Sequence, residues 1–82
     1  MLINMTNLQK YENAFIDALV IEQNQLTNLE YQAISEWDSV GHMYLIVALE
    51  EAFDIMIDTD DIIDFSSYEK GKEILKKYDV EI

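Results

Sequence analysis

The chain has 82 residues, with 17 acidic against 5 basic side chains and a net charge of −12. This length allows one small domain, spanning residues 1–82. So acidic a surface is repelled by nucleic acid and by anionic membranes, which excludes both as expected partners. The absence of cysteine excludes disulfides and thiolate metal sites. With no proline, two glycines and no long apolar run, the composition favours an all-α, cytoplasmic monomer.

The first predicted element is a helix from about Asn7 to about Glu22. Thr6 and Gln9 form the pattern of a capping box at its start. The following stretch, to Glu36, is polar, and we expect a long ordered loop, a kind of segment that is often functional. Its isolated apolar residues are expected to close one end of the helical bundle. They are Leu26, Leu29, Tyr31 and Ile34.

A second helix is predicted to start at Asp38 or Ser39 and to end near Phe53. The Asp38 carboxylate can accept hydrogen bonds from the free N–H groups of a first helical turn. At 100° per residue, one apolar face is expected to pack into the core. This face contains Leu45, Ile46, Leu49, Ala52 and Phe53.

The same helix carries a second apolar group on the opposite arc. This group contains Val40, Met43 and Val47, with Tyr44 at its edge, and it is interleaved with Glu50, Glu51 and Asp54. Apolar residues ringed by acids predict a surface that binds a basic partner protein. The alternative is that the loop after the first helix covers this group.

The remaining elements are a short third helix, capped at Asp58 or Thr59, and a last helix. A capping box from Ser66 to Glu69 opens the last helix, which is expected to run to about Tyr78. The predicted fold is therefore an all-α, small four-helix bundle with three main helices and one short third helix.

Ser39 is the main candidate functional residue. Its hydroxyl lies at a predicted helix start, where the free N–H groups and the positive end of the helix dipole favour a phosphate group. A phosphodiester on Ser39 would also lie beside the predicted partner surface. Serine is common at helix starts, so a purely structural cap is the alternative.

Four segments resemble the acyl carrier protein family. They are Asp38-Ser39-Val40, the run Ala48-Leu49-Glu50-Glu51-Ala52-Phe53, the acidic run Ile57-Asp58-Thr59-Asp60-Asp61, and Ser66-Ser67-Tyr68. The Asp38-Ser39-Val40 tripeptide alone is a weak motif. The four segments together, at these offsets, are a specific pattern, and the resemblance covers nearly the whole chain.

The resemblance implies a four-helix bundle that carries 4′-phosphopantetheine on Ser39, and a carrier rather than an enzyme. A phosphopantetheinyl transferase would attach the arm from coenzyme A with magnesium, supported by Asp38. An acyl- or aminoacyl-loading enzyme and a downstream acyltransferase or synthase would then use the thiol of the arm. Val40, Met43 and Val47 match family positions that meet partner enzymes.

The chain departs from the commonest family pattern around the serine. The departures are Trp37, Gly41, His42 and Tyr44. They are interpreted as changes to the recognition face, which favours a specialised pathway, such as polysaccharide modification, aminoacyl transfer or secondary metabolism, over primary fatty-acid synthesis.

Three other functions are weaker. A serine hydrolase would need Ser39 and His42 to converge with an acid, but no oxyanion-hole loop is apparent. The acidic run lacks the glycine and the closing glutamate of an EF-hand, which argues against a dedicated calcium site. An unmodified acidic helical module that binds proteins through the second helix is the main alternative.

Overall fold

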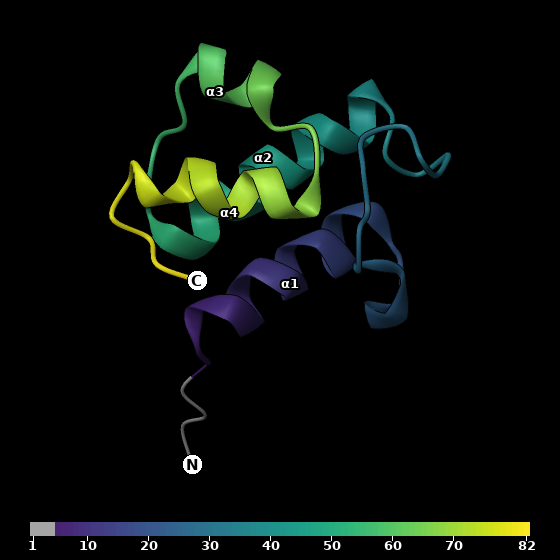
Figure 1. The fold of residues 1–82 in the computed structure, drawn as a ribbon, viewed down its shortest axis with the longest axis horizontal. Coiled ribbons are helices and arrows are strands. Elements are labelled where there is room, and N and C mark those ends of the chain that lie inside the picture. The colour runs from purple at the N-terminus through teal and green to yellow at the C-terminus, as the bar shows by residue number, and fades with distance from the viewer. Residues whose placement is uncertain (1–4) are drawn as a thin grey trace.

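Four α-helices form the part of the chain that the computed structural model describes, residues 5–82 (Figure 1). In chain order the elements are α1 (Asn7–Leu19), the short 3-10 helix η1 (Gln23–Gln25), α2 (Ser39–Phe53), α3 (Thr59–Asp64) and α4 (Tyr68–Lys76). The predicted all-α bundle, with three main helices and a short third helix, is confirmed. Within residues 5–82, no helix is both long and apolar enough to cross a membrane.

The predicted capping box starts α1. Thr6 Oγ1 accepts the N–H of Gln9 at 3.1 Å, and Gln9 Oε1 accepts the N–H of Thr6 at 2.8 Å. The predicted end near Glu22 is wrong, because α1 ends at Leu19. Val20 turns into the left-handed region, with φ 54° and ψ 56°, and this conformation ends the helix.

The segment between α1 and α2 is an ordered loop, as predicted. Two backbone hydrogen bonds of 2.9 Å join it to the start of α4, one from the N–H of Tyr31 to Ser66 and one from the N–H of Tyr68 to Leu29. Leu26 and Leu29 are buried and Tyr31 is half-buried, so apolar residues of the loop do pack onto the bundle.

The start of α4 differs from the prediction by one residue. Ser67, not Ser66, is the cap, and its Oγ accepts the N–H of Lys70 at 2.9 Å. The carbonyl of Ser66 is already bonded to the loop, which keeps Ser66 outside the helix. The helix ends at Lys76 rather than at Tyr78.

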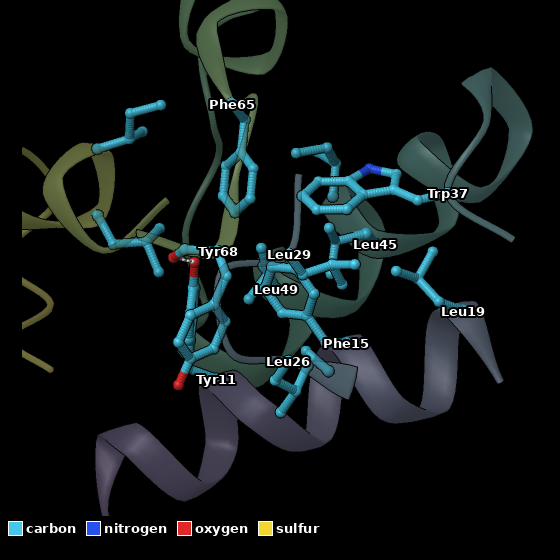
Figure 2. Packing of buried hydrophobic residues seen from close by; sticks show 14 of the residues in the cluster. Tyr11, Phe15, Leu19, Leu26, Leu29, Trp37, Leu45, Leu49, Phe65 and Tyr68 are labelled. Atoms are coloured by element: carbon cyan, nitrogen blue, oxygen red, sulfur yellow. Dashed lines mark hydrogen bonds between the residues drawn. The ribbon is translucent and has the colours of Figure 1, made fainter. Parts of the chain in front are cut away.

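The core lies between α1 and α2 and is covered by α4, the loop and the segment after α3. Aromatic rings from α1, the loop, the segment after α3 and α4 meet at its centre, against leucines of α2 (Figure 2). On α2, the predicted core residues Leu45, Ile46 and Leu49 are fully buried. Aromatic side chains remove large apolar areas from water, so they stabilise a bundle of this small size.

Gly71 lets α4 approach α1 closely. A Cβ at this position would lie 2.2 Å from both the Phe65 ring and the Tyr11 hydroxyl. The Tyr11 hydroxyl donates a hydrogen bond of 2.6 Å to the carbonyl of Tyr68, which satisfies it inside the core. Burial raises the pKa of the Tyr11 phenol well above its ordinary value, so this donor stays protonated.

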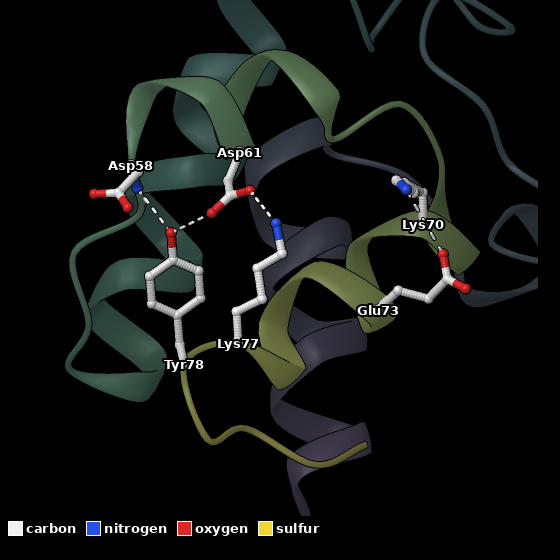
Figure 3. A network of polar contacts seen from close by, with 6 residues as sticks. All are labelled: Asp58, Asp61, Lys70, Glu73, Lys77 and Tyr78. Carbon is white, nitrogen blue, oxygen red and sulfur yellow. Dashed lines mark hydrogen bonds and ion pairs between the residues drawn. The ribbon is translucent and has the colours of Figure 1, made fainter.

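A polar network fastens α3 to the C-terminal end of α4 (Figure 3). Asp61 accepts from the Tyr78 hydroxyl at 2.6 Å and from Lys77 Nζ at 2.9 Å. The same hydroxyl accepts the N–H of Asp58 at 2.9 Å, at the start of α3. The hydrogen bond from Tyr78, followed by that from Lys77, lowers the pKa of Asp61, so this nearly buried carboxylate is held ionised.

Candidate functional site

Ser39 is exposed and is the first residue of α2. The predicted cap is confirmed as Asp38, whose Oδ1 accepts the N–H of Gly41 at 2.8 Å. The capping bond therefore comes from Asp38, and Ser39 is not the helix cap. This leaves an exposed hydroxyl in the first turn of a helix, where the positive end of the dipole favours an attached anion.

Gly41 holds the chain before α2 against the helix. A Cβ on Gly41 would lie 2.1 Å from the carbonyl oxygen of Glu36 and 3.1 Å from the Leu19 side chain. Only glycine fits this contact without displacing backbone. Gly41 therefore allows the backbone at Glu36 and the end of α1 at Leu19 to lie close to the first turn of α2.

Trp37 is part of the core, and His42 lies between the core and the surface. Trp37 is 0% exposed and Gly41 is buried, so the interpretation that these two residues change the recognition face is wrong, whereas His42 is half-buried. Trp37 Nε1 donates to His42 Nδ1 at 2.9 Å. The other ring nitrogen, Nε2, then carries the hydrogen and donates to the carbonyl of Ile62 at 2.8 Å. Of the four departures from the family pattern, only Tyr44 is exposed.

The second apolar group of α2 is exposed. The exposed fractions are 59% for Val40, 51% for Met43, 62% for Tyr44 and 46% for Val47. The alternative that the loop covers these side chains is therefore wrong. Two acids, Glu51 on α2 and Asp54 directly after the helix, are exposed as well. The exposed face of α2 thus combines apolar contact area near Ser39 with negative charge at the other end of the helix.

Glu50 differs from the other acids of this helix. It is half-buried, and its Oε2 accepts the N–H of Ile57 at 2.9 Å. The carboxylate therefore holds the segment that follows α2, which is a structural role the helical periodicity did not indicate. Glu51 remains exposed and can meet a partner.

Sequence reasoning missed exposed apolar residues outside α2, and two of them lie in or just before α3. Met56, before α3, is 82% exposed, and Ile63, on α3, is 72% exposed. The available signal was the pair Ile62-Ile63 within the acidic run, since adjacent residues on a helix of one or two turns cannot both face the core. Ile62 is half-buried, and Ile63 points away.

A small hollow of about 200 Å³ lies between the loop, α2 and α3. Its lining residues are Tyr31, His42, Ile62, Ile63, Phe65 and Ser66. Because His42 follows Ser39 by about one helical turn, this hollow lies close to the exposed hydroxyl. Residues 5–82 contain no group of three or more histidine and carboxylate side chains that could hold a metal ion.

Comparisons with known proteins identify no relative. No family model, no curated protein and no solved structure matches the chain. The function must therefore be argued from the site itself and from the short segments that resemble acyl carrier proteins.

Proposed function

We propose that this chain is an acyl carrier protein, on which Ser39 bears 4′-phosphopantetheine and presents thioester-linked acyl or aminoacyl groups to partner enzymes. One observation carries the proposal. Ser39 is an exposed hydroxyl that is not needed as a cap, at the head of a helix whose exposed face is apolar and acidic. The segments that resemble the family add to it.

Coenzyme A is the only phosphopantetheine donor that the attachment reaction requires. The Ser39 oxygen attacks the β-phosphorus of coenzyme A, and an Oγ–P bond forms as the pyrophosphate bond breaks. Adenosine 3′,5′-bisphosphate leaves, and the hydroxyl proton passes to a base on the transferase. The chain contributes an accessible oxygen and a helix terminus that tolerates the new negative charge. Asp38, adjacent to the oxygen, supports magnesium in the transferase complex.

Partner enzymes would dock on the exposed face of α2. Val40, Met43 and Val47 supply apolar contact area, Tyr44 extends it, and Glu51 adds negative charge. The net charge of −12 steers basic enzyme surfaces towards this face. Rates with such partners should fall as salt is added, because the steering field is screened over about 10 Å at 0.1 M salt.

Intact mass measurement tests the modification. The protein is incubated with coenzyme A, magnesium and a broad-specificity phosphopantetheinyl transferase. We expect the wild type to gain one phosphopantetheine, Ser39→Ala to gain none, and the matched control Ser35→Ala, which alters another exposed serine, to gain one. A wild type that keeps its mass, with the transferase active on a known carrier, rules out the proposal.

A pair of substitutions tests the docking face. Met43→Lys places a cation in the apolar group, and Leu8→Lys makes the same kind of change at an exposed position on α1. We expect Met43→Lys to lower kcat/KM of the transferase at least tenfold, about 1.4 kcal/mol, whereas Leu8→Lys behaves as wild type. Both should keep the wild-type melting temperature. Unfolding of Met43→Lys would instead place this side chain in the core.

The unmodified helical interaction module remains the second candidate. It is favoured by the exposed α2 face, which is present whether or not Ser39 is modified. The two functions differ in the mass experiment, since only a carrier gains the arm. A module of this kind would bind basic proteins equally well as wild type and as Ser39→Ala.

A further inference from the structure

The centre of the bundle is occupied by aromatic rings. The Trp37 ring lies edge-to-face against Phe15, with 5.4 Å between ring centroids, and against Phe65 at 6.5 Å. It stacks on His42 at 6.1 Å and meets Tyr31 edge-on at 6.1 Å. In Figure 2 Phe65 points down from the top and Trp37 extends from the right, both towards Phe15. The space under the first turns of α2 is therefore filled by rings in mutual contact.

Hydrogen bonds fix these rings in place. The His42 ring bridges two parts of the fold, because Nδ1 accepts from Trp37 and Nε2 donates to the Ile62 carbonyl at the end of α3. The hollow nearest to Ser39 lies at this point, between the loop, α2 and α3. Moving either ring aside would break a partly buried hydrogen bond and cost stability.

The open space near Ser39 is small. The hollow that His42 shares with α3 holds about 200 Å³, whereas ligand pockets usually begin at about 300 Å³. A larger hollow of about 490 Å³ lies between α1 and α2, but on α2 it is lined only from Ala48 onwards. That hollow is in the second half of the helix, away from the serine.

We infer that the thioester cargo of this carrier stays outside the bundle and is a short or polar acyl or aminoacyl group rather than a long alkyl chain. The inference rests on the proposed function. A long alkyl chain that finds no room inside remains in water, and each exposed methylene is unfavourable. A short or charged group exposes few methylenes to water, so it needs no hydrophobic cavity in the carrier.

The test compares two cargoes on the same protein. The transferase loads wild type from acetyl-coenzyme A or octanoyl-coenzyme A, and intact mass confirms each product. Melting temperature and amide hydrogen exchange of the core are then measured. We expect both forms to melt within about 1 °C of each other with unchanged exchange. An octanoyl chain buried in the bundle would raise the melting temperature by roughly 10 °C or more, which would overturn the inference.

A cavity variant provides the matched control. Phe65→Ala removes one of the rings around Trp37 and opens space beside His42. In this variant the octanoyl form should melt above the acetyl form, and equal melting would overturn the role assigned to the rings. If Phe65→Ala does not fold, Phe65→Leu makes the same comparison with a smaller cavity.

The outcomes separate this inference from the proposed function. If the transferase loads nothing, the carrier function fails, but the closed interior can still be tested with soluble octanoyl-pantetheine. An unchanged melting temperature with this probe supports the closed interior, and a raised one overturns it. If loading succeeds and octanoyl stabilises the wild type, the carrier function stands and only the inference about the cargo falls.

Discussion

Replacing Gly41 with alanine tests the contact that holds the chain before α2 against the helix. The new Cβ would lie 2.1 Å from the carbonyl oxygen of Glu36, and this atom belongs to backbone that cannot rotate aside. Overpacking costs about 1–3 kcal/mol, and so short a contact belongs in the upper part of that range. Alanine recovers about 1 kcal/mol through its helix propensity. We therefore expect a net loss of about 1–2 kcal/mol, or roughly 5–15 °C in melting temperature.

Thermal unfolding followed by far-ultraviolet circular dichroism measures this loss. Val47→Ala is the control, because it changes an exposed side chain of the same helix, and we expect it to alter stability by less than about 0.5 kcal/mol. If Gly41→Ala melts at or above the wild-type temperature, propensity outweighs the clash and the reasoning about the close contact is refuted.

Three further predictions concern stability. Val20→Asn should raise the free energy of unfolding in urea by about 0.5–1 kcal/mol, because asparagine tolerates the left-handed conformation that a β-branched residue resists; an unchanged urea midpoint would contradict this. Because the folded pKa of Asp61 is lowered, its stabilising contribution is present above about pH 4 and is lost as the pH falls through the folded value. Asp61→Asn should therefore lose less stability than wild type on acidification, and parallel acid titrations of the two would count against the network. Trp37→Phe leaves His42 Nδ1 without its donor and should lower stability by about 1–3 kcal/mol, seen as a lower urea midpoint at unchanged m; a wild-type midpoint would show that the bond is not needed.

The sequence predicted helix starts well where a side chain caps the first turn of its own helix. The caps at Thr6 and Asp38 follow from residue type and spacing, and both form as expected. The end of α1 carries no such signal, since Val20 takes a conformation that usually needs glycine or asparagine. The cap of α4 moved to Ser67 because of a contact with the distant loop, which a window of a few residues does not contain.

In the candidate site, too, features set by local pattern were predicted, and features set by contacts between distant segments were not. The helical wheel of α2 correctly separated a buried face from an exposed one, because both faces are set by periodicity. Trp37 lies just outside the helix, so periodicity says nothing about it, and its burial depends on rings contributed by α1 and by the segment after α3. The pairing of Asp61 with Lys77 likewise joins separate elements, so no local pattern in the sequence predicts it.

The two ends of the described chain are held together at one pole of the bundle. Asn7 Nδ2 donates a hydrogen bond of 2.9 Å to the carbonyl of Glu81, and Met5 shares a hollow with Glu51 in the second half of α2. Ser39 opens the first turn of that helix, at the other pole. A linker, a fused domain or a surface tether attached at either end would therefore leave the molecule on the side away from the hydroxyl. The domain can be immobilised or joined head to tail while the Ser39 hydroxyl stays accessible.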